Sequence, residues 1–234
     1  MFTSNRGEKT VGVFRHGQEG KLEKVRVGGF PNGLSFDPSR DNLLAANVSK
    51  QDDPAPITVS IVEPRKKILT ADIVVPGRTR WTVFDSKMDR FYVNISKPSQ
   101  IVAIESKDPD GVAGTYDIPA TGPHGLDVDV EGRRLFCACD QGGLFTVDLT
   151  SRRVSRVSNL SGPPDVIFYN SQLHHLYVAI GEPGVVDVFD TDTMKLIQTV
   201  KTEEGAHTIG YDLEGNKVYA FLPETHRASV YIDE

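Results

Sequence analysis

A single phrase recurs five times along the chain. Each copy has a small or turn-forming residue, a polar residue, and then an alternating apolar segment that closes on Asp or Asn. The copies span residues 31–37, 79–85, 123–129, 164–170 and 206–212, and their closing residues lie 48, 44, 41 and 42 residues apart. A period of this length in short strand-like segments, without helical patterning, is typical of the blades of a β-propeller.

Further strand-like segments follow each copy. The second segment, such as residues 135–139, is apolar without alternation, which predicts burial on both faces. The third segment, such as residues 185–190, closes on an acidic residue that is expected to accept backbone N–H groups in the next turn. The chain therefore predicts an all-β fold of four-stranded blades of about 40–48 residues, in a single domain over residues 1–234.

The two ends of the chain bear on the number of blades. Two strand-like segments, residues 10–14 and 22–27, precede the first full repeat, and the last repeat stops after a third strand at residues 228–232. An N-terminal strand that completed the last blade would close the ring and cover an exposed sheet edge. We therefore predict a five-repeat propeller closed in this way. The alternative is a shortened or fragmentary six- or seven-bladed propeller.

The repeats resemble those of a known family. Tyr92-Val93-Asn94, followed by Ile101-Val102-Ala103-Ile104, looks like the YVTN-type repeat of YncE-like propellers, and the resemblance covers nearly the whole chain. It implies a β-propeller fold. It implies less about activity, since YncE-like and related propellers include exported binding proteins, lactonase relatives and streptogramin-type lyases. YncE-like relatives are often exported, whereas residues 1–10 lack the apolar core of a signal peptide, so the compartment stays open.

The net charge and the hydropathy pattern argue against nucleic-acid binding and against a membrane-spanning helix. The net charge of −6 disfavours a protein that binds phosphate backbones, because such proteins depend on clustered Lys and Arg. No segment approaches the roughly 18 consecutive apolar residues of a membrane-spanning helix. We therefore predict neither a nucleic-acid partner nor a membrane span, and expect a small molecule or a protein as the partner.

The repeats differ in the residue just before the innermost strand. Innermost strands line the channel of a propeller, so these residues are expected at the channel mouth. Loops after the second strands are expected to return to the same face and to add carboxylates. Trp81 is either interblade core or an aromatic that stacks on a flat ligand. The predicted binding residues are Asn32, Arg80, Trp81, His124, Asp140, Asp165, Glu182 and His207.

Three functions fit these residues. The leading hypothesis is a non-catalytic propeller that binds a small anionic ligand or a peptide, with Arg80 recognising a carboxylate or phosphate and the histidines making binding pH-sensitive. The first alternative is a metal-assisted lyase or lactone hydrolase with a divalent metal at His124, Asp165 and His207. The second is a protein-interaction scaffold. Standard catalytic motifs are missing, so an enzyme is less expected, and no cofactor is expected outside the metal alternative.

Two further features have structural interpretations. Cys137 and Cys139 alternate on one strand, a geometry that fits a disulfide badly, so we predict buried free thiols, with a soft-metal pair as the alternative. His174 and His175 open a second strand on the face opposite the predicted mouth, and we expect surface roles for both.

Overall fold

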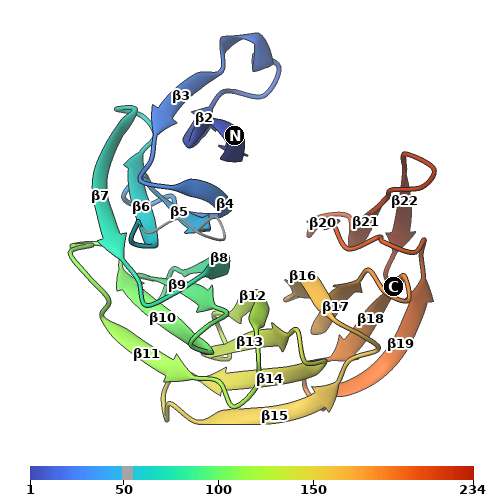
Figure 1. Ribbon diagram of the computed structural model, residues 1–234. Helices are drawn as coiled ribbons and strands as arrows, with labels where there is room; N and C mark the ends of the chain where they lie inside the picture. The colour runs from blue at the N-terminus through green and yellow to red at the C-terminus, as the bar shows by residue number, and fades with distance from the viewer. Residues whose placement is uncertain (49–54) are drawn as a thin grey trace. The chain divides into compact units, whose positions relative to one another are not determined.

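The computed structural model describes residues 1–48 and 55–234 (Figure 1). They form two compact units, Met1–Asp117 and Ile118–Glu234. The described residues contain 22 strands and two short 3₁₀ helices, η1 (Arg6–Glu8) and η2 (Glu19–Lys21), which confirms the all-β prediction. In this part of the chain, no helix has the length and apolar character to cross a membrane.

The first unit contains three antiparallel sheets in which neighbouring strands follow one another in the sequence. They are β1 (Phe2–Asn5), β2 (Thr10–Val13) and β3 (Glu23–Arg26); then β4 (Phe30–Asp37), β5 (Asn42–Val48), β6 (Thr58–Glu63) and β7 (Ile68–Val74); then β8 (Thr79–Asp85), β9 (Arg90–Ile95), β10 (Gln100–Glu105) and β11 (Gly114–Asp117).

The second unit also contains three antiparallel sheets with sequential strand order. They are β12 (Pro123–Asp129), β13 (Arg134–Cys139), β14 (Gly143–Asp148) and β15 (Val154–Asn159); then β16 (Pro164–Asn170), β17 (His175–Ile180), β18 (Val185–Asp190) and β19 (Lys195–Lys201); then β20 (Ile209–Asp212), β21 (Lys217–Leu222) and β22 (Arg227–Ile232). The first strands of successive sheets, β12 and β16, lie side by side within this unit (Figure 1).

The number of sheets corrects the predicted number of repeats. The described residues form six sheets rather than five, because β1, β2 and β3 pair with one another in a sheet of their own. The sheet at the other end of the chain is β20–β22, so the strand order also corrects the predicted closure by an N-terminal strand. Pairing between strands that are close in sequence closes only a short loop, which costs less chain entropy than a long-range pairing.

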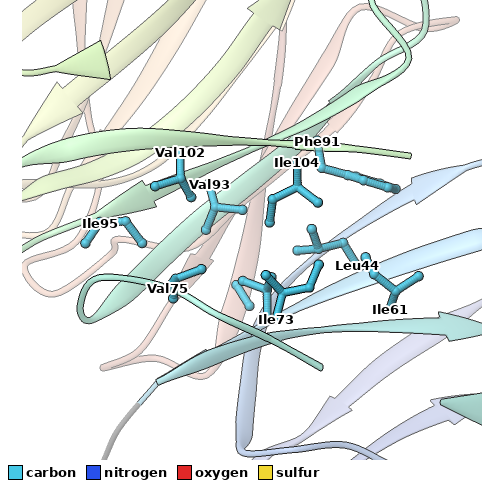
Figure 2. Close-up of a cluster of buried hydrophobic side chains, with 11 residues drawn as sticks. Leu44, Ile61, Ile73, Val75, Phe91, Val93, Ile95, Val102 and Ile104 are labelled. Atoms are coloured by element: carbon cyan, nitrogen blue, oxygen red, sulfur yellow. The ribbon is translucent and has the colours of Figure 1, made fainter. Parts of the chain in front are cut away.

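The core lies between consecutive sheets. In the first unit, Leu44 and Ile61 of one sheet pack against a cluster that includes Phe91, Val93 and Ile104 of the next sheet (Figure 2). All five are fully buried. A buried side chain of this kind contributes roughly 1.5–3 kcal/mol relative to an exposed one. All but the first residue of each of β9, β13 and β17 is buried, which confirms the predicted burial of both faces of these second strands.

The Asp or Asn that closes each repeated phrase has a structural role. Its side-chain oxygen accepts a hydrogen bond from a backbone N–H two or three residues later, at 2.8–3.1 Å. This arrangement ends the first strand in a tight turn. The closing residues are Asp37, Asp85, Asp129, Asn170 and Asp212. The same bonding occurs after third strands, where Asp190 accepts from the N–H of Thr193 at 2.7 Å, as predicted.

Candidate functional site

The predicted site residues lie at irregularities of the first strands. In β4, β8, β12 and β16, the pairing register shifts at the position of the candidate residue. A β-bulge of this kind leaves a residue outside the ladder and changes the direction of its side chain. Four of the five aligned residues therefore lie within a strand, not before it as predicted: Asn32, Arg80, His124 and Asp165. Only His207 precedes its strand, β20.

Glycines in the repeated phrase allow neighbouring first strands to come close. A Cβ atom on Gly33 would lie 2.9 Å from the carbonyl oxygen of Arg80, and one on Gly125 would lie 2.6 Å from that of Asp165. Only a residue without a side chain fits at these two positions. The close approach brings the candidate residues of neighbouring repeats together within each unit.

In the second unit, His124 lies between two carboxylates. Its Nδ1 is 2.7 Å from Oδ1 of Asp140, which follows β13, and its Nε2 is 3.2 Å from Oδ1 of Asp165 on β16. A carboxylate only accepts hydrogen bonds, so an imidazole with N–H groups on both nitrogens satisfies both partners. The sequence prediction that the loop after the second strand returns to this position is confirmed for Asp140.

His207 extends this arrangement on the other side of Asp165. Its Nε2 lies 3.8 Å from Oδ2 of Asp165, and its Nδ1 lies 2.6 Å from the carbonyl oxygen of Gly205. The carbonyl can only accept, so the Nδ1 of His207 carries the proton. We call the four side chains Asp140, His124, Asp165 and His207 the imidazole–carboxylate cluster.

The cluster is partly open to solvent. The side chain of His124 is 16% exposed, that of Asp165 27%, and that of His207 55%. The side chain of Asp140 is 37% exposed, so His207 and Asp140 are the most exposed members of the cluster and His124 is the least exposed. The cluster offers hydrogen-bond donors and acceptors side by side. Across residues 1–48 and 55–234, no group of three or more His, Cys, Asp or Glu side chains is placed to hold a metal ion.

The remaining four predicted residues are not members of the cluster. Glu182 is exposed on the turn after β17. It follows Gly181, where an added Cβ would lie 3.2 Å from the Cβ of His207. Asn32 is exposed on β4, and its carbonyl accepts a hydrogen bond from Ser4 Oγ at 2.6 Å. Arg80 and Trp81 are half-buried on β8. Asn32, Arg80 and Trp81 belong to the first unit, so a single site built from all eight residues stays a prediction.

Sequence reasoning missed Asp127, which lies on β12 three residues after His124. Its Oδ2 accepts the backbone N–H of Tyr169 on β16 at 2.6 Å, and its Oδ1 accepts that of Val128 at 2.8 Å. Burial raises the pKa of Asp127 to about 6, although both hydrogen bonds oppose the shift. A charged residue between Leu126 and Val128 is the sequence signal that marks this position.

The two adjacent histidines of β17 and its preceding turn differ from each other. His174 is half-exposed beside Asp192, with 3.0 Å between the imidazole Nδ1 and the carboxylate, which fits the predicted surface position. His175 is only 18% exposed, and its Nδ1 lies 2.7 Å from Oδ2 of Asp233. His175 is therefore less exposed than His174, and its partner is a carboxylate distant in sequence.

Comparison with known proteins bears on the fold. No protein-family model and no curated protein matches the chain. Among solved structures, the chain is similar to hydrazine synthase of Kuenenia stuttgartiensis, with a TM-score of 0.66 over 99% of this chain and 92% of that chain, at 15% sequence identity. At this identity the likeness concerns the fold alone, and with the six small sheets it supports β-propeller-like repeats. The resemblance to YncE-like proteins stays a prediction.

Proposed function

We propose that the chain is a non-catalytic β-propeller that binds a small ligand or a peptide at the imidazole–carboxylate cluster. The observation that carries the proposal is the position of Asp165, whose two oxygens face His124 and His207 from different repeats. The partly exposed carboxylate of Asp165 lies on β16, and the two imidazoles on either side of it lie on β12 and just before β20. Together they form a polar group that can recognise a ligand. Binding sites commonly place a few such convergent polar groups on a rigid scaffold.

Of the two predicted ligand classes, the geometry favours a peptide over a small anion. An anion that approaches His207 also approaches the carboxylate of Asp165, which repels it. A peptide instead carries uncharged N–H groups, which can donate to Asp165 Oδ2 and to Nε2 of His207, the ring nitrogen without the proton. These two atoms of the cluster lie 3.8 Å apart, so adjacent polar groups of one backbone reach both.

The test is an NMR titration that follows the imidazole resonances. We would add the uncharged peptide N-acetyl-trialanine amide, and separately acetate and inorganic phosphate. The peptide should shift the ring signals of His207 and His124 saturably, and Asp165→Asn should weaken its binding about tenfold, the usual effect of removing a charged hydrogen-bond partner. His174→Gln is the matched control, since His174 also faces a carboxylate in the same unit.

Three outcomes would count against the proposal. They are no saturable shift with the peptide, equal weakening by Asp165→Asn and His174→Gln, and tighter binding of acetate or phosphate than of the peptide. The last result would restore the small anion as the ligand class.

The enzyme and scaffold hypotheses stay predictions. A metal-assisted lyase or lactone hydrolase would require Mg²⁺, Mn²⁺ or Zn²⁺ to raise the melting temperature, since a ligand that binds only the folded state stabilises it. A scaffold would tolerate substitution of His124 and His207 and lose its partner after charge reversals elsewhere on the surface.

A further inference from the structure

A second pocket in the C-terminal unit lies apart from the imidazole–carboxylate cluster. It has a volume of about 130 Å³ and lies between strands β18 and β19 of one sheet and β21 and β22 of the next. Its walls are mainly aliphatic, and its lining includes Val186, Val188, Val200, Val218, Tyr231 and Asp233. None of the predicted binding residues lines it.

One end of this pocket carries a fixed carboxylate. The Oδ2 of Asp233 accepts hydrogen bonds from Tyr177 Oη at 2.6 Å and from His175 Nδ1 at 2.7 Å. The backbone N–H of Asp233 donates to the carbonyl of Asn216 at 2.9 Å, which fixes the residue beyond the end of β22. The side chain of Asp233 is only 22% exposed.

The hydrogen bonds of Asp233 leave one oxygen for a further donor. Both side-chain hydrogen bonds reach Oδ2, so Oδ1 has lone pairs available among the described residues. Tyr177 keeps its proton, because burial and then the contact with Asp233 raise its pKa. The pocket therefore combines apolar walls with an anionic acceptor whose orientation is set by two donors.

We propose that this pocket binds a small ligand that joins one apolar ring to a primary ammonium group. Its volume is close to the roughly 150 Å³ of an engineered cavity that accepts benzene, so the pocket is large enough for one ring. The aliphatic walls favour the ring, and the carboxylate of Asp233 favours a cation, because charge attraction strengthens where water is partly excluded. Benzylamine is the simplest molecule with these two parts.

The experiment is a titration of the parent protein followed by the methyl signals of valine and isoleucine. The probes are benzylammonium, its uncharged analogue benzyl alcohol, and the anion phenylacetate. Benzylammonium should shift the methyl signals of Val188 and Val218 saturably and bind about tenfold more tightly than benzyl alcohol, as a charged hydrogen bond predicts. Phenylacetate should bind more weakly than either, because Asp233 repels it.

Two variants separate the ring site from the ammonium site. Asp233→Asn should weaken benzylammonium about tenfold and leave benzyl alcohol unchanged. Val188→Phe should fill the pocket and abolish both, while the imidazole signals of His124 and His207 report that the unit remains folded. Val200→Leu, a smaller change on the same wall, should weaken both probes if Val188→Phe fails to fold.

The proposal is overturned by any of three results. One is the absence of saturable methyl shifts with benzylammonium. Another is equal affinity for benzylammonium and benzyl alcohol, which would remove the role of Asp233. The third is unchanged binding of both probes in the Val188→Phe or Val200→Leu variant, which would place the ligand elsewhere.

Discussion

His124 and Asp165 occupy the same aligned position in neighbouring repeats, and their side chains meet, with 3.2 Å between Nε2 and Oδ1. Both residues sit in bulges of adjacent first strands, β12 and β16. The contact follows from the repeat itself, because a regular spacing places equivalent residues of consecutive sheets side by side. Residues that differ between repeats at this position therefore lie next to one another, as His124, Asp165 and His207 do in the second unit.

Gly125 controls the distance between these two strands, and its substitution by Ala should separate them. The new Cβ would lie 2.6 Å from the carbonyl oxygen of Asp165 and 2.7 Å from Cγ2 of Ile167, so the strands must move. We expect a loss of about 1–3 kcal/mol in the free energy of unfolding, as for other overpacked sites. Urea denaturation measures it.

The matched control for that substitution is Gly210→Ala on the aligned strand β20. A Cβ at Gly210 meets no atom within 4 Å, so this variant should change the free energy of unfolding by less than about 1 kcal/mol, in the stabilising direction. Equal destabilisation by both substitutions would show that the approach of Gly125 to Asp165 is not what makes that glycine necessary.

Asp127 should make the stability of the second unit depend on pH between about 4 and 6. Its folded-state pKa, about 6, lies above the roughly 3.9 of an unfolded Asp, so the folded state binds the proton more strongly. The stabilisation is complete below pH 4 and is lost as pH rises through 6. In the Asp127→Asn variant, the change in the free energy of unfolding between pH 4 and 7 should be smaller by on the order of 2 kcal/mol.

Denaturation of parent and Asp127→Asn proteins across this pH range checks the prediction. Asp148→Asn is a control with the opposite sign, because backbone N–H groups of Ser151 and Thr150 lower the pKa of Asp148. That variant should lose the stability that the parent retains above pH 4. A parent protein whose stability rose steadily from pH 4 to pH 7 would contradict the account of Asp127.

The sequence was sufficient to predict the local features of the fold. The period located the strands, and the closing Asp and Asn residues predicted the turns, because both depend on residues only a few positions apart. The N-terminal sheet was not predictable in this way. The strand β1 has only four residues, Phe-Thr-Ser-Asn, and its assignment depends on pairing with β2 rather than on its own apolar pattern.

The candidate site was predictable in part for the same reason. Repeat alignment placed His124, Asp165 and His207 together, and the antiparallel return of the second strand added Asp140. The contact of His175 with Asp233 was not predictable, because the two residues lie 58 positions apart. The residues next to His175 in the sequence do not indicate that partner.

Asp37 and Asp89 provide a test of how burial changes the contribution of an ion pair to the free energy of unfolding. Both carboxylates contact the guanidinium of Arg40, at 3.2 Å for Asp37 and 2.8 Å for Asp89. Asp37 is fully buried and also accepts from Ser106 Oγ, whereas the side chain of Asp89 is 48% exposed. We expect Asp37→Ala to cost about 3 kcal/mol of unfolding free energy, and Asp89→Ala less than about 1 kcal/mol.

The effect of Asp37 should also depend on pH. Burial opposes its ionisation, but hydrogen bonds from Ser106 and Ser39 lower the pKa of Asp37 overall. Its stabilising contribution is therefore present above the unfolded pKa of roughly 3.9 and is lost as pH falls below it. Urea denaturation at pH 7 and pH 3 measures both effects, and similar costs for the two alanine variants at pH 7 would contradict the role assigned to burial.

Cys137 and Cys139 should behave as protected thiols. Neither forms a disulfide, both are fully buried on β13, and their Sγ atoms lie 3.9 Å apart, which confirms the prediction of buried thiols. A thiol reagent reaches them only when the unit opens, and a domain stable by 5 kcal/mol or more opens in fewer than about one molecule in a thousand. Reaction with a chromogenic disulfide reagent should therefore be at least about a thousandfold slower in buffer than in guanidinium, where two thiols per chain react.

Cys139→Ser should leave one reactive thiol under denaturing conditions and preserve the slow reaction in buffer. Rapid reaction of the folded parent would show that β13 opens independently of the rest of the unit, and protection that disappears on adding a chelator would identify a soft metal between the two sulfur atoms.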